Sequence, residues 1–98
     1  MKEHDLKTLP CFFEALWRGV KPFELRKNDR DYCTGDALRL REWSPDDGYS
    51  GRIVRTTITY VLDASFPEAC KGLAEGFAIL GLGPLTWIEG DVVLHTQH

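Results

Sequence analysis

The sequence predicts an α+β fold, a small curled sheet or barrel of five or six strands with one N-terminal helix packed at its end. Three observations lead to this prediction. The 98 residues suffice for a single domain, 1–98. Short stretches of alternating or β-branched apolar residues recur along the chain, separated by turn residues. Helical spacing is clear only near the start, so the chain lacks the regular β/α alternation of a doubly wound sheet.

The first expected elements are a short strand and a helix. His4, Leu6 and Thr8 alternate with charged residues, which is typical of a strand with one buried face. Pro10 suits the first turn of a helix, and apolar residues then recur every three or four positions up to residue 20. Gly19 is placed to end this helix.

Strand patterns follow the helix. In KPFELRK, residues 21–27, we expect Phe23 and Leu25 to face one way and Glu24 and Arg26 the other. Later strands are expected at residues 37–43, 52–62 and 76–83, with a weaker edge strand within 86–96 and one helical turn near 67–71. Periodicity predicts a core that includes Phe12, Phe13, Leu16, Leu25, Leu38, Leu40, Ile58, Tyr60, Ile79 and Leu80.

Charges of both signs are concentrated in GVKPFELRKNDRDY, residues 19–32. Residues 18–41 contain seven basic and four acidic side chains, a net charge of +3, whereas the rest of the chain has five basic and eleven acidic side chains, a net charge of −6. A basic region on an acidic body attracts anions locally but repels long nucleic acids elsewhere. A solvated surface of mixed charge is the plain alternative.

Several motifs resemble a known family. The chain carries H-D-L-K at residues 4–7, G-x-K-x-F-E-L-R-x-N-D-R at 19–30 and G-D-x-L-x-L-x-E-W at 35–43, followed by GYSGR, ITYVL and GFAILGL. Together they resemble the ASCH-like proteins, named for homology to the activating signal cointegrator, within the PUA-like superfamily. The pattern is most similar to a small bacterial and phage branch of unknown function. The resemblance covers residues 4–82 and leaves 83–98 as a C-terminal extension.

The resemblance implies a five- or six-stranded β-barrel with an RNA-binding cleft beside the first helix. Glu24 would accept a hydrogen bond from a base amino group or fix the fork of Arg26, while basic side chains contact phosphate. In the structural alternative, Glu24 and Arg26 pair with cross-strand neighbours such as Arg39 or Glu42. The residues expected to contact RNA are Lys21, Glu24, Arg26, Arg30, Lys7 and His4.

A catalytic alternative also follows from the resemblance. One ASCH branch removes the acetyl group from N4-acetylcytidine, with a lysine in the place of Lys21 and a threonine nucleophile in the place of Glu24. A carboxylate cannot simply take over the role of that hydroxyl group. Glu24 could instead act as a general base while Lys21 steadies an oxyanion, or the pair could act as a ribonuclease. The sequence favours RNA or nucleotide binding over this hydrolase alternative and over an interaction module that uses the same cleft for a protein or peptide.

The expected partner is single-stranded or looped RNA, or a nucleoside-sized ligand, because the acidic body disfavours long duplexes. Trp43 and Tyr49 could stack on bases or pack within their hairpin. No cofactor or metal is expected, since the three cysteines are widely spaced and lack a C-x-x-C motif. The apolar runs are too short to span a membrane and no secretory signal is evident, so we expect a cytoplasmic protein. The sequence leaves the oligomeric state open.

Overall fold

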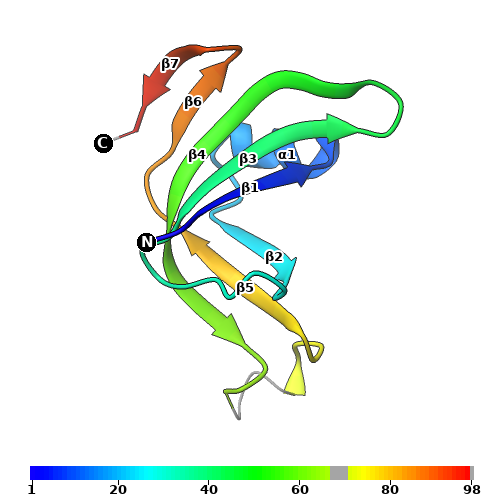
Figure 1. Ribbon diagram of the computed structural model, residues 1–98, viewed down its shortest axis with the longest axis vertical. Coiled ribbons are helices and arrows are strands. Elements are labelled where there is room, and N and C mark those ends of the chain that lie inside the picture. Colours follow the sequence, from blue (N-terminus) through cyan, green and yellow to red (C-terminus); the bar gives the residue numbers. More distant parts are fainter. Residues whose placement is uncertain (67–70, 98) are drawn as a thin grey trace.

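The fold is a mixed β-sheet with one helix (Figure 1). The computed structural model describes residues 1–66 and 71–97. In chain order its elements are β1 (Glu3–Thr8), α1 (Pro10–Trp17), β2 (Phe23–Lys27), β3 (Ala37–Ser44), β4 (Gly48–Asp63), β5 (Phe77–Leu82), β6 (Thr86–Glu89) and β7 (Val92–Thr96). The α+β class is confirmed. The described residues form seven strands, where five or six were expected, because the C-terminal extension contributes two.

β4 belongs to two halves of the sheet. The main path of paired strands is β1-β3-β4-β5-β2, and β6 and β7 branch from β4. Residues 48–57 of β4 pair with β3, whereas residues 58–63 pair with β5. A register shift between Ile58 and Tyr60 accompanies this change of partner, and such bulges bend a strand. β4 therefore curves through the molecule, and β1 and β2 become the two edges of the path (Figure 1).

The core lies against the concave side of the sheet and is closed by α1. Phe13 and Leu16 of α1 are fully buried against inward-facing residues of the strands. Burial of each such side chain contributes about 1.5–3 kcal/mol to folding. Ile79 of β5 is only partly buried. The core prediction is confirmed for Phe13, Leu16, Leu38, Leu40, Ile58 and Leu80.

Three predicted core residues lie at the surface instead. Phe12, Leu25 and Tyr60 are 53%, 55% and 57% exposed. Tyr60 follows the register shift in β4, which turns its ring outward to stack on Phe66 with the ring centroids 6.5 Å apart. α1 has only two turns and buries a narrow stripe that leaves Phe12 outside.

The buried side of β2 is the opposite of the one expected: the charged side faces inward and the apolar side faces solvent. Glu24 is 2% exposed, whereas Phe23 and Leu25 are 45% and 55% exposed. The inner side of β2 meets β1 at an edge whose backbone groups have no strand partner in the described residues. Arg26 donates to one of these groups, so polar side chains turn inward here and the apolar ones turn outward.

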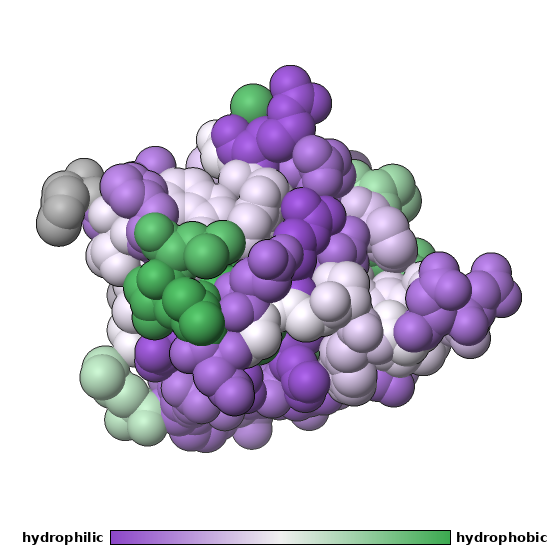
Figure 2. Space-filling model, turned by 90° about the horizontal axis from the view of Figure 1, so that it is seen from above, coloured by the Kyte–Doolittle hydropathy of each residue, from purple (hydrophilic) through white to green (hydrophobic). Residues whose placement is uncertain are grey.

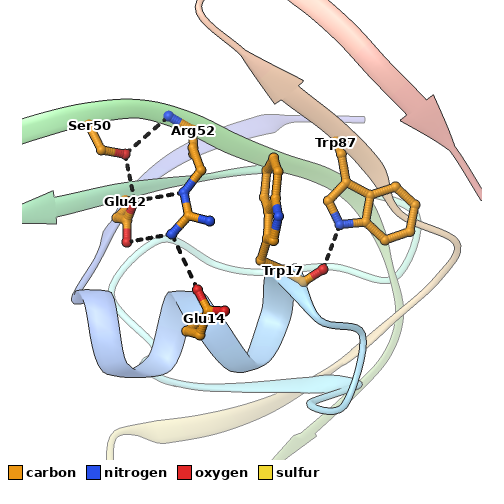
Figure 3. Close-up of polar contacts among 6 residues, drawn as sticks. All are labelled: Glu14, Trp17, Glu42, Ser50, Arg52 and Trp87. Carbon is orange, nitrogen blue, oxygen red and sulfur yellow. Dashed lines mark hydrogen bonds and ion pairs between the residues drawn. The ribbon is translucent and has the colours of Figure 1, made fainter.

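Two contacts fix α1 against the sheet (Figure 3). Arg52 of β4 donates to both oxygens of Glu42 at 3.0 Å and to Glu14 of α1 at 3.3 Å. The hydrogen bond from Arg52 outweighs burial and holds the pKa of Glu42 below its usual value. The Trp87 indole N–H donates to the carbonyl oxygen of Trp17 at 2.7 Å, which satisfies a carbonyl group at the end of the helix. The second half of α1 is thereby held against β4 and β6.

The C-terminal hairpin of β6 and β7 extends the sheet beyond β4. The weaker edge strand expected within 86–96 corresponds to both strands. Figure 2 shows a compact hydrophobic patch on the side of β7, where Val92, Val93 and Leu94 are 61%, 58% and 52% exposed. The helical turn expected near 67–71 falls, except for its last residue, outside the described residues. Within the described ranges, no helix has the length and apolar character to cross a membrane.

Candidate functional site

A cleft of about 490 Å³ opens at the seam between β1 and β2. The first turn of α1 and the residues that lead into β2 complete its walls. Pockets that take small ligands usually measure about 300–1,000 Å³, so this cleft has the size of a small-molecule site. Its lining is formed by Lys7, Thr8, Leu9, Phe12, Lys21, Phe23, Glu24, Leu25 and Arg26.

The floor of the cleft is a charged cluster around Glu24. Lys21 Nζ donates to Glu24 Oε1 at 2.5 Å, and Arg26 Nε donates to Glu24 Oε2 at 2.8 Å. The Glu24 side chain is 3% exposed, whereas those of Lys21 and Arg26 are 17% and 22% exposed. Two cations thus share one buried carboxylate, which leaves a net positive charge that faces the cleft.

Arg26 also joins the two edges of the sheet. Its Nη1 donates to the Lys7 carbonyl oxygen at 3.0 Å, and its Nη2 donates to Thr8 Oγ1 at 2.9 Å. In the described part of the chain, β1 and β2 form no backbone ladder with each other. The Arg26 guanidinium therefore bridges the seam at the place where a closed barrel would have a row of backbone hydrogen bonds.

The walls of the cleft are apolar and aromatic. Lys21 Nζ lies 5.4 Å from the ring centroid of Phe12 and 5.6 Å from that of Phe23. Leu9 and Leu25 extend the apolar surface, and all four apolar side chains are exposed. A cation between aromatic rings is stabilised by their faces. The cleft can therefore bind an anionic group next to flat apolar surfaces.

The cleft brings together most, but not all, of the predicted site residues. Lys21, Glu24 and Arg26 converge as expected, and Lys7 lines the rim with its Nζ 4.4 Å from the Trp43 ring centroid. Arg30 is exposed and is not among the residues that line the cleft. The expectation that Arg30 joins the cluster is wrong, because the loop after β2 runs toward the start of β1. There the Arg30 carbonyl oxygen accepts from Lys2 Nζ at 3.2 Å.

His4 is a buried structural residue and not part of the cleft lining. Its Nε2 lies 2.9 Å from Asp36 Oδ2, and the Asp36 carboxylate also accepts from the backbone N–H groups of Lys2 and Cys33. The hydrogen bond with His4, supported by the one from Lys2, lowers the pKa of Asp36 to about 2. The Tyr32 ring packs edge-on against His4, with the centroids 4.7 Å apart. His4 thus anchors the loop between β2 and β3 and is not brought together with the residues that line the cleft.

The cross-strand alternative for the charged strand is wrong in detail. Glu24 and Arg26 pair with each other, whereas Arg39 pairs with Asp5 and Glu42 pairs with Arg52.

The sequence also did not reveal Phe12, Phe23 and Leu25 as site residues. One signal was available. If a carboxylate and an arginine at alternate positions form the inner face of a strand, the apolar residues between them must face outward.

The chain matches, over residues 3–82, the family described as a domain of unknown function (DUF3850), and it belongs to that family. β1 to β5 and all residues that line the cleft lie within the matched part. The hairpin of β6 and β7 lies outside it.

A particular relative comes from Escherichia phage P2. The chain is 41% identical over 64 residues to an uncharacterized 12.9 kDa protein in the GpA 3′ region of that phage. The match covers 65% of this chain and 58% of the phage protein. The family and this relative agree with the expected resemblance to a bacterial and phage group of unknown function. The wider ASCH-like relationship stays a prediction.

Proposed function

We propose that the chain is an RNA-binding module whose cleft takes one nucleotide of a single-stranded or looped RNA. The observation that carries this proposal is the position of Lys21, whose ammonium lies within 5.6 Å of the ring centroids of both Phe12 and Phe23. A cation that can contact phosphate therefore lies next to aromatic faces on which a base can stack. Unpaired nucleotides are recognised by this combination in many RNA-binding proteins.

Each residue of the cleft has a distinct role in the proposal. The base lies against Phe12 and Phe23, and the phosphate lies near Lys21 and Lys7. Arg26 uses three of its five N–H groups within the described residues, so two remain for a base edge or a phosphate oxygen. Glu24 fixes the two cations and does not itself contact the base, since it is 2% exposed.

We also infer that the sheet is a variant of the PUA-like barrel that the sequence resembles. Two features support this inference. β4 curves through both halves of the sheet, and the edges β1 and β2 approach closely enough for Arg26 to span them. The cleft lies beside α1 at this seam, as expected for the cleft of an ASCH-like protein.

The geometry favours binding over the catalytic alternative. A general base needs a free lone pair that points toward the proton it removes. Each oxygen of Glu24 already accepts a hydrogen bond from a cation, and the residue is only 2% exposed, so a substrate proton has little access to its remaining lone pairs. The Thr8 hydroxyl group accepts from Arg26, which is a donor and cannot remove the proton of the hydroxyl group as a base would.

The proposal is tested by NMR titration with ribonucleoside 5′-monophosphates and with dinucleotides of each base. We expect shifts that centre on the end of β1 and on β2. Phe12→Ala should weaken binding about tenfold through lost stacking. Lys21→Ala should reduce the salt dependence by about 0.7 in the slope of log K against log salt concentration. Arg18→Ala, which removes an exposed cation at the end of α1, is the control and should bind normally. If neither Phe12→Ala nor Lys21→Ala changes the affinity for the nucleotides, the proposal is refuted.

A further inference from the structure

The outer face of β1, β3 and β4 carries a second group of cations. Leu38 and Leu40 of β3 face inward, so the alternation of the strand puts Arg39 and Arg41 on the outer face. Lys7 pairs across the sheet with Arg41, and Arg39 pairs with Arg55. Like charges directly opposite each other destabilise a sheet, so this arrangement is costly for a purely structural surface. We call this surface the basic face; it is formed by Lys7, Arg39, Arg41, Trp43, Tyr49 and Arg55.

Two carboxylates offset these charges only in part. Asp5 Oδ2 lies 2.9 Å from Arg39 Nη1 and 3.7 Å from Arg41 Nη1. Glu3 lies 3.7 Å from Arg55. Asp5 is 45% exposed and Glu3 is 53% exposed at the side chain, so solvent screens both interactions. The basic face keeps an excess of two positive charges on a chain whose net charge is −3.

The basic face also offers surfaces for stacking. The Arg41 guanidinium carbon lies 3.8 Å from the Tyr49 ring centroid, and Tyr49 is the cross-strand partner of Trp43. Bases stack on aromatic rings and on guanidinium planes alike. Beside this pair lies a hollow of about 230 Å³, whose lining includes Arg39, Arg41, Tyr49 and Arg52 together with the acidic residues Glu42 and Asp91.

Lys7 connects the basic face with the cleft. It lines the cleft, and its Nζ also lies 4.4 Å from the ring centroid of Trp43. The two surfaces thus share one cation at the end of β1. A chain that leaves the cleft first passes Lys7 and only then reaches Arg41 and Tyr49.

We propose that the basic face is the second half of the RNA site. An unpaired strand with one nucleotide in the cleft continues over Lys7, stacks a base on the Arg41–Tyr49 pair and places phosphates near Arg39 and Arg55. This inference rests on the proposed function of the cleft and extends it from one nucleotide to a strand. Charge complementarity selects a polyanion, and the stacked pair selects one that carries bases.

The experiment compares short and long RNA on the same variants. A dinucleotide reaches only the cleft, whereas a single-stranded decanucleotide reaches both surfaces. For the wild type we expect the decanucleotide to bind at least about tenfold more tightly than the dinucleotide, since one stacked base alone contributes that much. Tyr49→Ala and Arg41→Ala should remove most of this gain and leave dinucleotide binding unchanged. Arg41→Ala should also lower the salt slope for the decanucleotide by about 0.7.

A variant that is expected to bind RNA more tightly shows whether the other substitutions act on binding or simply unfold the protein. Asp5→Asn removes the carboxylate that engages Arg39 and Arg41, so decanucleotide binding should tighten, with no change for the dinucleotide. If the two arginines serve only to pair with Asp5, this variant will not bind RNA more tightly. Arg18→Ala, which removes a cation from the opposite side of the sheet, is the charge-matched control.

The outcomes separate the two proposals. Equal affinity for both lengths, with binding still dependent on Phe12, would overturn the basic face and leave the cleft proposal intact. Decanucleotide binding that depends on Arg41 and Tyr49 but not on Phe12 or Lys21 would support the basic face and overturn the cleft. Competition by a polyglutamate peptide as effective as that by RNA would assign the basic face to an acidic peptide and overturn its RNA role. No binding of either length would overturn both.

Discussion

Glu24 is a buried carboxylate that holds one cation on each oxygen. A buried ion pair adds little net stability over an apolar alternative, but removal of one partner leaves the other without compensation. The side chains of Lys21 and Arg26 are 17% and 22% exposed, so they retain part of their hydration. We therefore regard Glu24 as a positioning residue that aims both cations at the cleft.

Replacement of Glu24 by glutamine tests this role. Glu24→Gln keeps the shape but removes the charge, and it turns an amide N–H₂ toward one of the two cations. We expect the free energy of unfolding to fall by about 1–3 kcal/mol in urea titrations. Glu3→Gln is the matched control, because its exposed pair with Arg55 at 3.7 Å should contribute less than about 0.5 kcal/mol. Equal effects of the two substitutions would contradict the positioning role.

A second prediction at the residue scale concerns N4-acetylcytidine. Purified protein should leave this nucleoside intact over long incubation, because the resemblance to the ASCH amidohydrolases, if it holds, places Glu24 where those proteins have their threonine nucleophile. Both of its oxygens are also occupied by Lys21 and Arg26. Chromatography of the incubated nucleoside detects cytidine directly. Cytidine and acetate that appear with wild-type protein and disappear with Lys21→Ala would establish catalysis and displace the binding proposal.

At the scale of elements, the loop between β2 and β3 depends on one buried pair. Asp36 accepts hydrogen bonds from His4 and from two backbone N–H groups, and it thereby ties residues 33–36 to the start of β1. The pKa of Asp36 is lowered from 3.8 to about 2, mainly by the hydrogen bond with His4. A carboxylate with a lowered pKa stabilises the fold above its ordinary pKa and loses this contribution as the pH falls toward the lowered value.

Acid titration of the free energy of unfolding checks this contribution. The difference between wild type and Asp36→Asn should stay constant above the ordinary pKa of 3.8 and shrink as the pH falls toward 2. Asp47→Asn is the control, since Asp47 is exposed in the turn before β4. A difference that stays constant down to pH 2 would show that the Asp36 carboxylate does not stabilise the fold through its charge.

At the scale of the whole molecule, local patterns and long-range contacts contributed differently to what could be predicted. α1, β3 and β4 follow from periodicity, and the alternation of residues 4–8 correctly predicted the strand β1. The orientation of β2 could not be read from its own residues, because it depends on the unpaired edge of β1 that Arg26 meets across the seam. The convergence around Glu24 was foreseen because Lys21, Glu24 and Arg26 lie close together in the sequence. The apolar walls of the cleft were not foreseen, because they depend on the orientation of β2.

Arg26 bridges the two edges of the sheet. One guanidinium donates to Glu24 on β2 and to Lys7 and Thr8 on β1, so it connects strands that are far apart along the path of paired strands. A lysine keeps the charge, but its single ammonium cannot reproduce the planar fork that serves three acceptors in fixed directions. If Arg26 closes the seam, Arg26→Lys should open it without loss of the core.

Hydrogen exchange and denaturation together test this closure. Arg26→Lys should lower the free energy of unfolding by about 1–3 kcal/mol, as expected for lost hydrogen bonds to a charged group. Exchange should accelerate at the amides of β1 and β2 while those of β3 and central β4 keep their protection relative to global unfolding, because the core packs against the latter strands. Arg30→Lys is the control, as Arg30 is exposed on the loop and outside the cleft. If RNA binds in the cleft as proposed, it contacts both edges and should restore protection to β1 and β2 in the variant. Uniform acceleration in all strands would instead show that Arg26 contributes only general stability.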